Sequence, residues 1–241
     1  MEEPVADTRA DAPPAGRPTL IDKLLPRVVR SAVAYGDVPD EPPFPGEADL
    51  IANAVESRRR EFITARRCAR QALGLLGLPA TAIRPGPKRE PLWPAGVVGS
   101  LTHCAGYRAA AVARVAEVSS VGIDAEPHGP LPDGVLRSVV APGDTESLHR
   151  VTAGDPTTHW DRLLFSAKEA VYKAWFPLTG RWLGFNDARL EIDPQARTFT
   201  AHLLVAGDRL DGAPPLTALS GSYLVDRGLV VTAVVIEPPG R

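Results

Sequence analysis

The chain has 241 residues, enough for one large domain or two small ones, with 44% hydrophobic and 23% charged residues. Its formal net charge of −2 excludes the overall basic field typical of nucleic-acid-binding proteins. Two cysteines are too few for a disulfide framework or a cysteine-rich zinc site, and no apolar run approaches the roughly 20 residues of a membrane span. We therefore expect a soluble cytoplasmic protein that contacts neither nucleic acid nor membrane.

The first half of the sequence predicts one long helix and several strands. Residues 1–18 are acidic, rich in proline and alanine, and lack the pattern of a signal peptide, so we expect a disordered lead-in. Apolar residues at helical spacing predict a helix over residues 57–76. A loop rich in proline and glycine follows at 78–94. The strands expected after it cover 97–102, 108–115 and 118–126.

The second half repeats this plan. An amphipathic helix is expected over residues 160–176, where Pro177 stops it. The strands expected after this helix cover 188–192, 198–205, 217–225 and 229–236. The pattern indicates an α+β fold of two similar halves related by a pseudo-twofold axis, each a mostly antiparallel sheet packed with a long helix. We expect the first half at residues 19–124 and the second at 125–241.

Two carboxylates end one of the predicted strands. Because side chains alternate along a strand, Asp124 and Glu126 point to the same face, and Pro127 ends the ladder. Neighbouring carboxylates repel each other unless a cation lies between them, and magnesium prefers such oxygen ligands. The alternative is a pair of solvated acids at a strand end.

The second predicted helix carries one acid among two lysines. Glu169 and Lys173 are four residues apart and share a face, whereas Lys168 projects about a quarter-turn away. A surface ion pair would explain this spacing. The same residues could also supply a metal ligand, a base and phosphate contacts within one turn.

Basic and hydroxyl residues in the first half form a third group. His103 follows Ser100 and Thr102 in a stretch between two glycines. Such a stretch could bring hydrogen-bond donors to a phosphate. The alternative is a structural role, which is common for a lone histidine. Six arginines crowd the first helix, either as a solvated face or as a bidentate phosphate site. Lys88 and Arg89 add a basic pair in the following loop.

These motifs together resemble the 4′-phosphopantetheinyl transferases, especially the monomeric class that activates peptide and polyketide synthases. Gly122–Glu126 followed by Phe165–Lys173 resembles the paired signatures of that family. Phe165 stands where many members have tryptophan, which keeps an aromatic side chain. The further matching stretches are Arg58–Phe62, Glu90–Pro94, Gly99–Cys104 and Trp175–Thr179.

The resemblance implies two similar α+β halves with coenzyme A in the cleft between them. The metal ligands that it implies, for magnesium or alternatively manganese, are Asp124, Glu126 and Glu169. The catalytic groups that it implies are Glu169, Lys168, Lys173 and His103. The coenzyme A contacts that it implies are Arg58, Arg66, Lys88, Arg89, Ser100, Thr102, His103, Asp124, Lys168 and Lys173.

The activity implied is the transfer of 4′-phosphopantetheine from coenzyme A to a serine of acyl or peptidyl carrier proteins. Such a monomeric enzyme would release adenosine 3′,5′-bisphosphate and activate fatty-acid, polyketide or nonribosomal peptide synthases. Glu169 would take the serine proton. We also expect residues 179–185, with Arg181 and two aromatic side chains, to dock the acidic carrier.

Two other functions use the same residues. A magnesium-dependent nucleotide or coenzyme A pyrophosphohydrolase would replace the serine with water and need no carrier. A non-catalytic binding module would be expected to lack one of the three acids, and all three are present.

Overall fold

The structure is a computed structural model, and it describes residues 18–240. The lead-in expected at residues 1–18 lies outside the described residues except for Pro18. No helix within this described range has the length and apolar character that a membrane span requires. The elements in chain order are η1 (Ile21–Lys23), β1 (Arg30–Ala34), η2 (Ala48–Ile51), α1 (Glu56–Leu75), β2 (Val97–Cys104), β3 (Tyr107–Arg114), β4 (Ser120–Pro127), α2 (Val135–Val139), α3 (Asp144–Gly154), α4 (Trp160–Thr179), η3 (Phe185–Asp187), β5 (Ala188–Asp193), β6 (Thr198–Leu203), β7 (Ala218–Asp226) and β8 (Leu229–Ile236).

The first half packs helix α1 against a three-stranded antiparallel sheet of order β1-β3-β2. The predicted helix is confirmed to within one residue at each end. Its buried face carries Cys68, Ala69, Ala72 and Leu73, which form a core with Val112 and other sheet residues. The periodic apolar spacing of the sequence is therefore the buried stripe of α1.

The second half packs helix α4 against a five-stranded antiparallel sheet of order β4-β8-β7-β6-β5. Helix α4 runs past Pro177 to Thr179, beyond the predicted end at Phe176. A proline in the last turn removes only its own N–H bond, and Gly180, in the left-handed conformation, ends the helix instead. The amide of Gly180 donates to Phe176 O at 2.8 Å.

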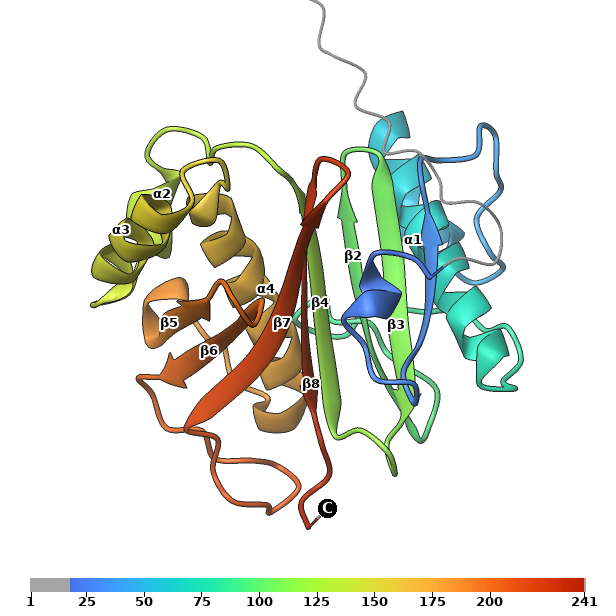
Figure 1. The fold of residues 1–241 in the computed structure, drawn as a ribbon. Coiled ribbons are helices and arrows are strands. Elements are labelled where there is room, and N and C mark those ends of the chain that lie inside the picture. The colour runs from blue at the N-terminus through green and yellow to red at the C-terminus, as the bar shows by residue number, and fades with distance from the viewer. Residues whose placement is uncertain (1–17, 241) are drawn as a thin grey trace, which may run out of the picture.

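The two halves share an architecture but are unequal, since the second adds strands and the helices α2 and α3. Both long helices lie on one side of the sheets, and the segment around η1 covers the opposite side (Figure 1). The core on that opposite side contains residues of both halves. The α+β fold is thus confirmed. The predicted division after residue 124 falls inside β4, which pairs with β8 throughout.

Strands β2 and β4 lie next to each other at the edges of the two sheets. Two hydroxyl groups link them in place of a backbone ladder. Ser100 Oγ accepts the amide of Ile123 at 3.1 Å, and Thr102 Oγ1 accepts the amide of Ala125 at 3.0 Å. These bonds satisfy buried backbone donors of β4 that would otherwise be costly to bury.

Helix α4 crosses β4 in direct backbone contact at Gly122. A Cβ atom at this position would lie 2.0 Å from Ala170 O and 2.7 Å from Ala174 N. Only glycine allows this approach. Residues on the same face of β4 therefore lie directly below the middle of α4.

Besides the short 3-10 helices η1, η2 and η3, one strand and two helices were not predicted from the sequence. Strand β1 has only five residues and begins with an arginine. Helix α2 is equally short, and α3 carries few apolar residues on its buried face. None of them has an apolar pattern sustained over enough residues for a helix or strand to be predicted.

We predict that Gly122→Ala strongly destabilises the fold. The new methyl group overlaps the α4 backbone, which cannot move away as a flexible side chain would. The expected loss is at least about 3 kcal/mol in the free energy of unfolding, measured by denaturant titration. Gly129→Ala is the matched control, because nothing lies within 4 Å of a Cβ there. Equal stability of the two variants would contradict the close contact.

Candidate active site

The site forms where β4 meets α4. Val121, Ile123 and Ala125 point into the shared core, which confirms the predicted alternation. The opposite face presents Asp124 and Glu126 to α4, where each contacts a basic side chain of the helix.

Asp124 is 5% exposed and lies at the centre of the site. Its Oδ1 accepts bonds from Lys173 Nζ at 2.7 Å and from Thr102 Oγ1 at 3.2 Å. Its Oδ2 is buried and has no hydrogen-bond partner within the described chain. A buried carboxylate oxygen without a partner is costly, so this atom is suited to hold a cation or a donor.

Two further carboxylates surround Asp124. Burial raises the pKa of Glu126, and the charge of Asp124 raises it further, although Arg162 opposes the shift from 3.0 Å. Burial also raises the pKa of Glu169, with Lys173 lowering it and Asp124 raising it. The charge of Asp124 thus destabilises the charged forms of both glutamates, which a cation between the acids would relieve.

The described side chains do not form a ready-made metal cluster. Among residues 18–240, no group of three or more His, Cys, Asp or Glu side chains is placed to hold a metal ion as it stands. The unpartnered oxygen of Asp124 and the raised pKa values of Glu126 and Glu169 nevertheless fit a hard cation that prefers oxygen ligands.

The first half contributes His103 from β2. Arg58 Nη1 donates to His103 Nε2 at 2.9 Å, and Glu61 lies 3.7 Å from Nδ1. Burial lowers the pKa of His103, Glu61 opposes this, and the positive charges of Arg58 and Lys173 lower it further. Because Lys173 belongs to α4, its influence on His103 places groups of both halves around one site.

Glu61 is held in turn by a buried arginine. Arg108 is 5% exposed, lies 3.7 Å from Glu61 and makes a bidentate pair with Asp37. This support was not predicted from the sequence. The spacing of Arg58 and Glu61, one helical turn apart, was its only local signal.

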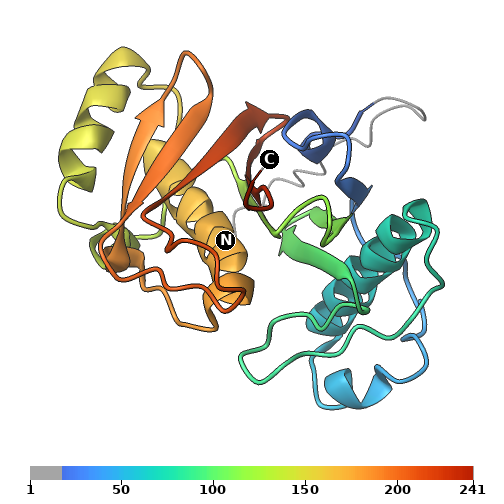
Figure 2. The ribbon, with the colours of Figure 1, turned by 90° about the horizontal axis from the view of Figure 1, so that it is seen from below.

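The other predicted basic residues lie farther along the first half. Arg66 Nε donates to Ile83 O at 2.9 Å, and its guanidinium lies 3.4 Å from the centre of the Phe62 ring. Lys88 and Arg89 are exposed on a tight hairpin loop in which the amide of Leu92 donates to Arg84 O. This loop extends from the first half toward the C-terminal end of α4 (Figure 2).

The hairpin loop approaches the site closely enough to affect it. Burial raises the pKa of Tyr172, and the charges of Glu169 and of Glu90 in the loop raise it further. Tyr172 also packs on Trp182, with ring centres 4.8 Å apart, and Trp182 is 72% exposed. An exposed aromatic surface therefore lies one turn of α4 beyond Glu169.

The structure does not bring all predicted residues together. The Lys168 ammonium is buried on another face of α4, where Asp144, Val139 O and Phe185 O take its three hydrogen bonds. Its ammonium therefore lies on a different face of α4 from Glu169, because successive residues of a helix are turned by about 100°. The hydroxyls of Ser100 and Thr102, predicted to contact coenzyme A, accept amides of β4.

Arg162 was missed as well. It binds Glu126 Oε2 and the carbonyl oxygens of Gly129 and Pro130. A spacing of seven residues, almost two full turns, puts Arg162 on the same side of α4 as Glu169. This spacing could have predicted from the sequence that Arg162 lies near the acids of the site.

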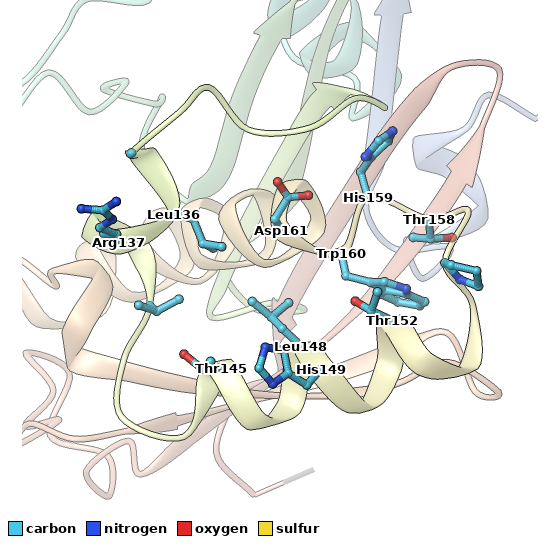
Figure 3. Close-up of a pocket in the computed structure, with 13 residues that line it drawn as sticks. Leu136, Arg137, Thr145, Leu148, His149, Thr152, Thr158, His159, Trp160 and Asp161 are labelled. Carbon is cyan, nitrogen blue, oxygen red and sulfur yellow. The ribbon is translucent and has the colours of Figure 1, made fainter.

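A cavity of about 580 Å³ lies elsewhere, between α2, α3 and the start of α4. Figure 3 shows Leu136, Leu148 and Trp160 around its interior and Arg137, His149 and His159 nearer its rim. None of the predicted site residues lines it. Its lining lacks the acids and lysine that meet at β4 and α4.

Two family models match successive parts of the chain. Residues 46–113 match the 4′-phosphopantetheinyl transferase N-terminal domain, and residues 120–223 match the 4′-phosphopantetheinyl transferase superfamily. The gap between these two matches ends where β4 begins.

Individual relatives are similar over most of the chain. The chain is 52% identical to 4′-phosphopantetheinyl transferase Svp of Streptomyces mobaraensis, over 91% of its own length and 90% of that relative. It is 52% identical to 4′-phosphopantetheinyl transferase PptT of Mycobacterium tuberculosis, over 90% and 98%. It is 32% identical to enterobactin synthase component D of Salmonella typhimurium, over 66% and 64%. The chain belongs to the 4′-phosphopantetheinyl transferase superfamily.

Proposed function

We propose that this protein transfers the 4′-phosphopantetheine arm of coenzyme A to a serine of acyl or peptidyl carrier proteins. The observation that carries the proposal is the meeting of Asp124, Glu126, Glu169 and Lys173 beside His103, in a chain about half identical to named 4′-phosphopantetheinyl transferases. Acids for a metal, a base and fixed positive charges are what transfer from a pyrophosphate requires.

Glu169 is the proposed general base. Its raised pKa moves it toward neutral pH, where a carboxylate accepts a proton more readily. The serine oxygen forms a bond to the β-phosphorus of coenzyme A, and its proton passes to Glu169. The bond from that phosphorus to the bridging oxygen breaks, and adenosine 3′,5′-bisphosphate leaves with the electron pair.

The basic side chains bind and neutralise the phosphates. Lys173 lies beside Asp124, where charge develops on the pyrophosphate. Arg58 offers donors beside His103 at the first-half side of the site. Lys88 and Arg89, on the exposed loop, are available for the 3′-phosphate.

Magnesium, or manganese in its place, would be held by Asp124, Glu126 and Glu169. The metal would supply charge neutralisation on the pyrophosphate oxygens. The supporting observations are the unpartnered Oδ2 of Asp124 and the raised pKa values of the other two acids.

The carrier docks, in this proposal, on the exposed surface that follows α4. Trp182 and Leu210 are 72% and 75% exposed, and the backbone of Leu210 bonds to Leu178 O. Arg181 beside them can pair with an acidic carrier helix, since its only carboxylate neighbour in the described chain, Asp208, lies 3.9 Å away. Aromatic and arginine side chains are common anchors of such interfaces.

We predict that an apo carrier protein gains about 340 Da, one phosphopantetheine, when incubated with this protein, coenzyme A and magnesium. Intact-mass spectrometry measures the gain, and a chelator should abolish it. Breakdown of coenzyme A without any gain on several unrelated carriers would instead indicate a pyrophosphohydrolase. Neither gain nor breakdown would indicate a binding module.

We predict that Glu169→Gln lowers kcat by about 100-fold or more, because the serine loses its base, while coenzyme A still binds. Initial rates by mass spectrometry and titration calorimetry with coenzyme A measure the two effects. Glu146→Gln, an exposed acid on α3, is the control. Excess magnesium should not restore the rate, whereas it would offset a lost metal ligand. Near-normal turnover would refute the base assignment.

We predict that Trp182→Ala raises the KM for the carrier about tenfold or more, as expected for an interface anchor, and that Arg181→Glu acts in the same direction. Leu75→Ala, which removes another exposed apolar side chain at the end of α1, should leave this KM unchanged. A rise in the KM for coenzyme A alone would assign the aromatic surface to coenzyme A and not to the carrier.

A further inference from the structure

A buried carboxylate outside the active site joins several elements of the second half. Asp144, the first residue of α3, is fully buried. Its Oδ1 accepts the amide of Leu190 at 2.7 Å, and its Oδ2 accepts the amide of Ala141 at 2.7 Å. Lys168 Nζ also binds Oδ2 at 2.5 Å. One side chain thus connects α3, the segment before it, β5 and α4.

Lys168 completes this junction. Its ammonium group donates to Val139 O at 2.8 Å and to Phe185 O at 2.7 Å, in addition to Asp144. All three N–H bonds of Lys168 are therefore used within the protein, which leaves none for a phosphate. Burial lowers the pKa of Lys168, and the bond to Asp144 opposes the shift.

The junction lies next to the proposed base. Lys168, Glu169 and Ala170 follow one another on α4, and Ala170 is the residue in backbone contact with Gly122 of β4. Glu169 therefore lies between two fixed points on different faces of the helix. A rotation of α4 by about 10° would move a carboxylate roughly 6 Å from the helix axis by about 1 Å.

An ion pair suits this task better than apolar packing. A buried pair gains little stability over well-packed apolar side chains, because both charges lose their hydration. Three directional bonds to three different elements nevertheless fix the rotation of α4, which apolar contacts define less sharply. A misplacement of about 1 Å in a catalytic group can lower the rate about 100-fold.

We infer that Asp144 and Lys168 are a positioning pair that fixes the rotation of α4 and so places Glu169 toward the carrier serine. The inference rests on the proposed transferase activity. A positioning role and a phosphate-binding role of Lys168 affect different parameters. Loss of positioning lowers kcat, whereas loss of a phosphate contact weakens coenzyme A binding.

The Lys168→Met variant tests this inference. Its kcat and its KM values for carrier and coenzyme A are measured from intact-mass rates, and its Kd for coenzyme A is measured by calorimetry. We expect kcat to fall about 10- to 100-fold, with the Kd for coenzyme A changed by less than about twofold. Leu219→Ala is the control for lost stability, since this buried core residue on β7 makes no polar side-chain contact. Its kcat should match the unaltered protein.

Asp144→Asn keeps the inference testable if Lys168→Met does not fold. It should lower kcat to a similar degree, and the double variant should be no slower than the slower single variant, because both changes break one interaction. A weakening of coenzyme A binding by about tenfold or more in Lys168→Met would overturn the inference in favour of phosphate contact. An unchanged kcat in either folded variant would also overturn it. Failure of the unaltered protein to modify any carrier would refute the proposed function instead.

Discussion

The backbone contact between β4 and α4 at Gly122 is the constraint on which the site depends. Without a side chain at this position, the strand and the helix approach closely enough for Lys173 to reach Asp124. The acids of the strand and Glu169 of the helix then share one small volume, where burial and the charge of Asp124 raise the pKa values of Glu126 and Glu169. A single missing Cβ thus links a packing requirement to the electrostatics of the site.

The site also depends on the junction between the two halves. His103 comes from the first sheet, and Lys173 comes from the helix on the second. Burial lowers the pKa of His103, and the charge of Lys173 lowers it further. Thr102 serves both purposes, since its hydroxyl accepts a β4 amide and donates to Asp124. The hydroxyls predicted as ligand contacts are therefore part of the support behind the acids.

Local periodicity accounts for what the sequence could predict. Alternation along β4 correctly paired Asp124 with Glu126, and helical spacing correctly grouped Glu169 with Lys173, because both patterns depend on neighbouring residues alone. The position of Lys168 was not predictable in this way. Its partners come from α2, α3 and η3, short elements with weak patterns, so only the folded chain shows which face of α4 they cover. The metal and substrate roles remain predictions.

The core on the side of η1 joins both sheets, with Tyr107 of β3, Ile123 of β4 and Val231 of β8 in one cluster. Neither half can expose its share of this cluster without exposing that of the other. We therefore expect the two halves to unfold in a single cooperative transition, despite the repeated architecture. A ligand that binds at their junction would raise the midpoint temperature of the whole transition. A spectroscopic probe anywhere in the molecule would then detect ligand binding as a thermal shift.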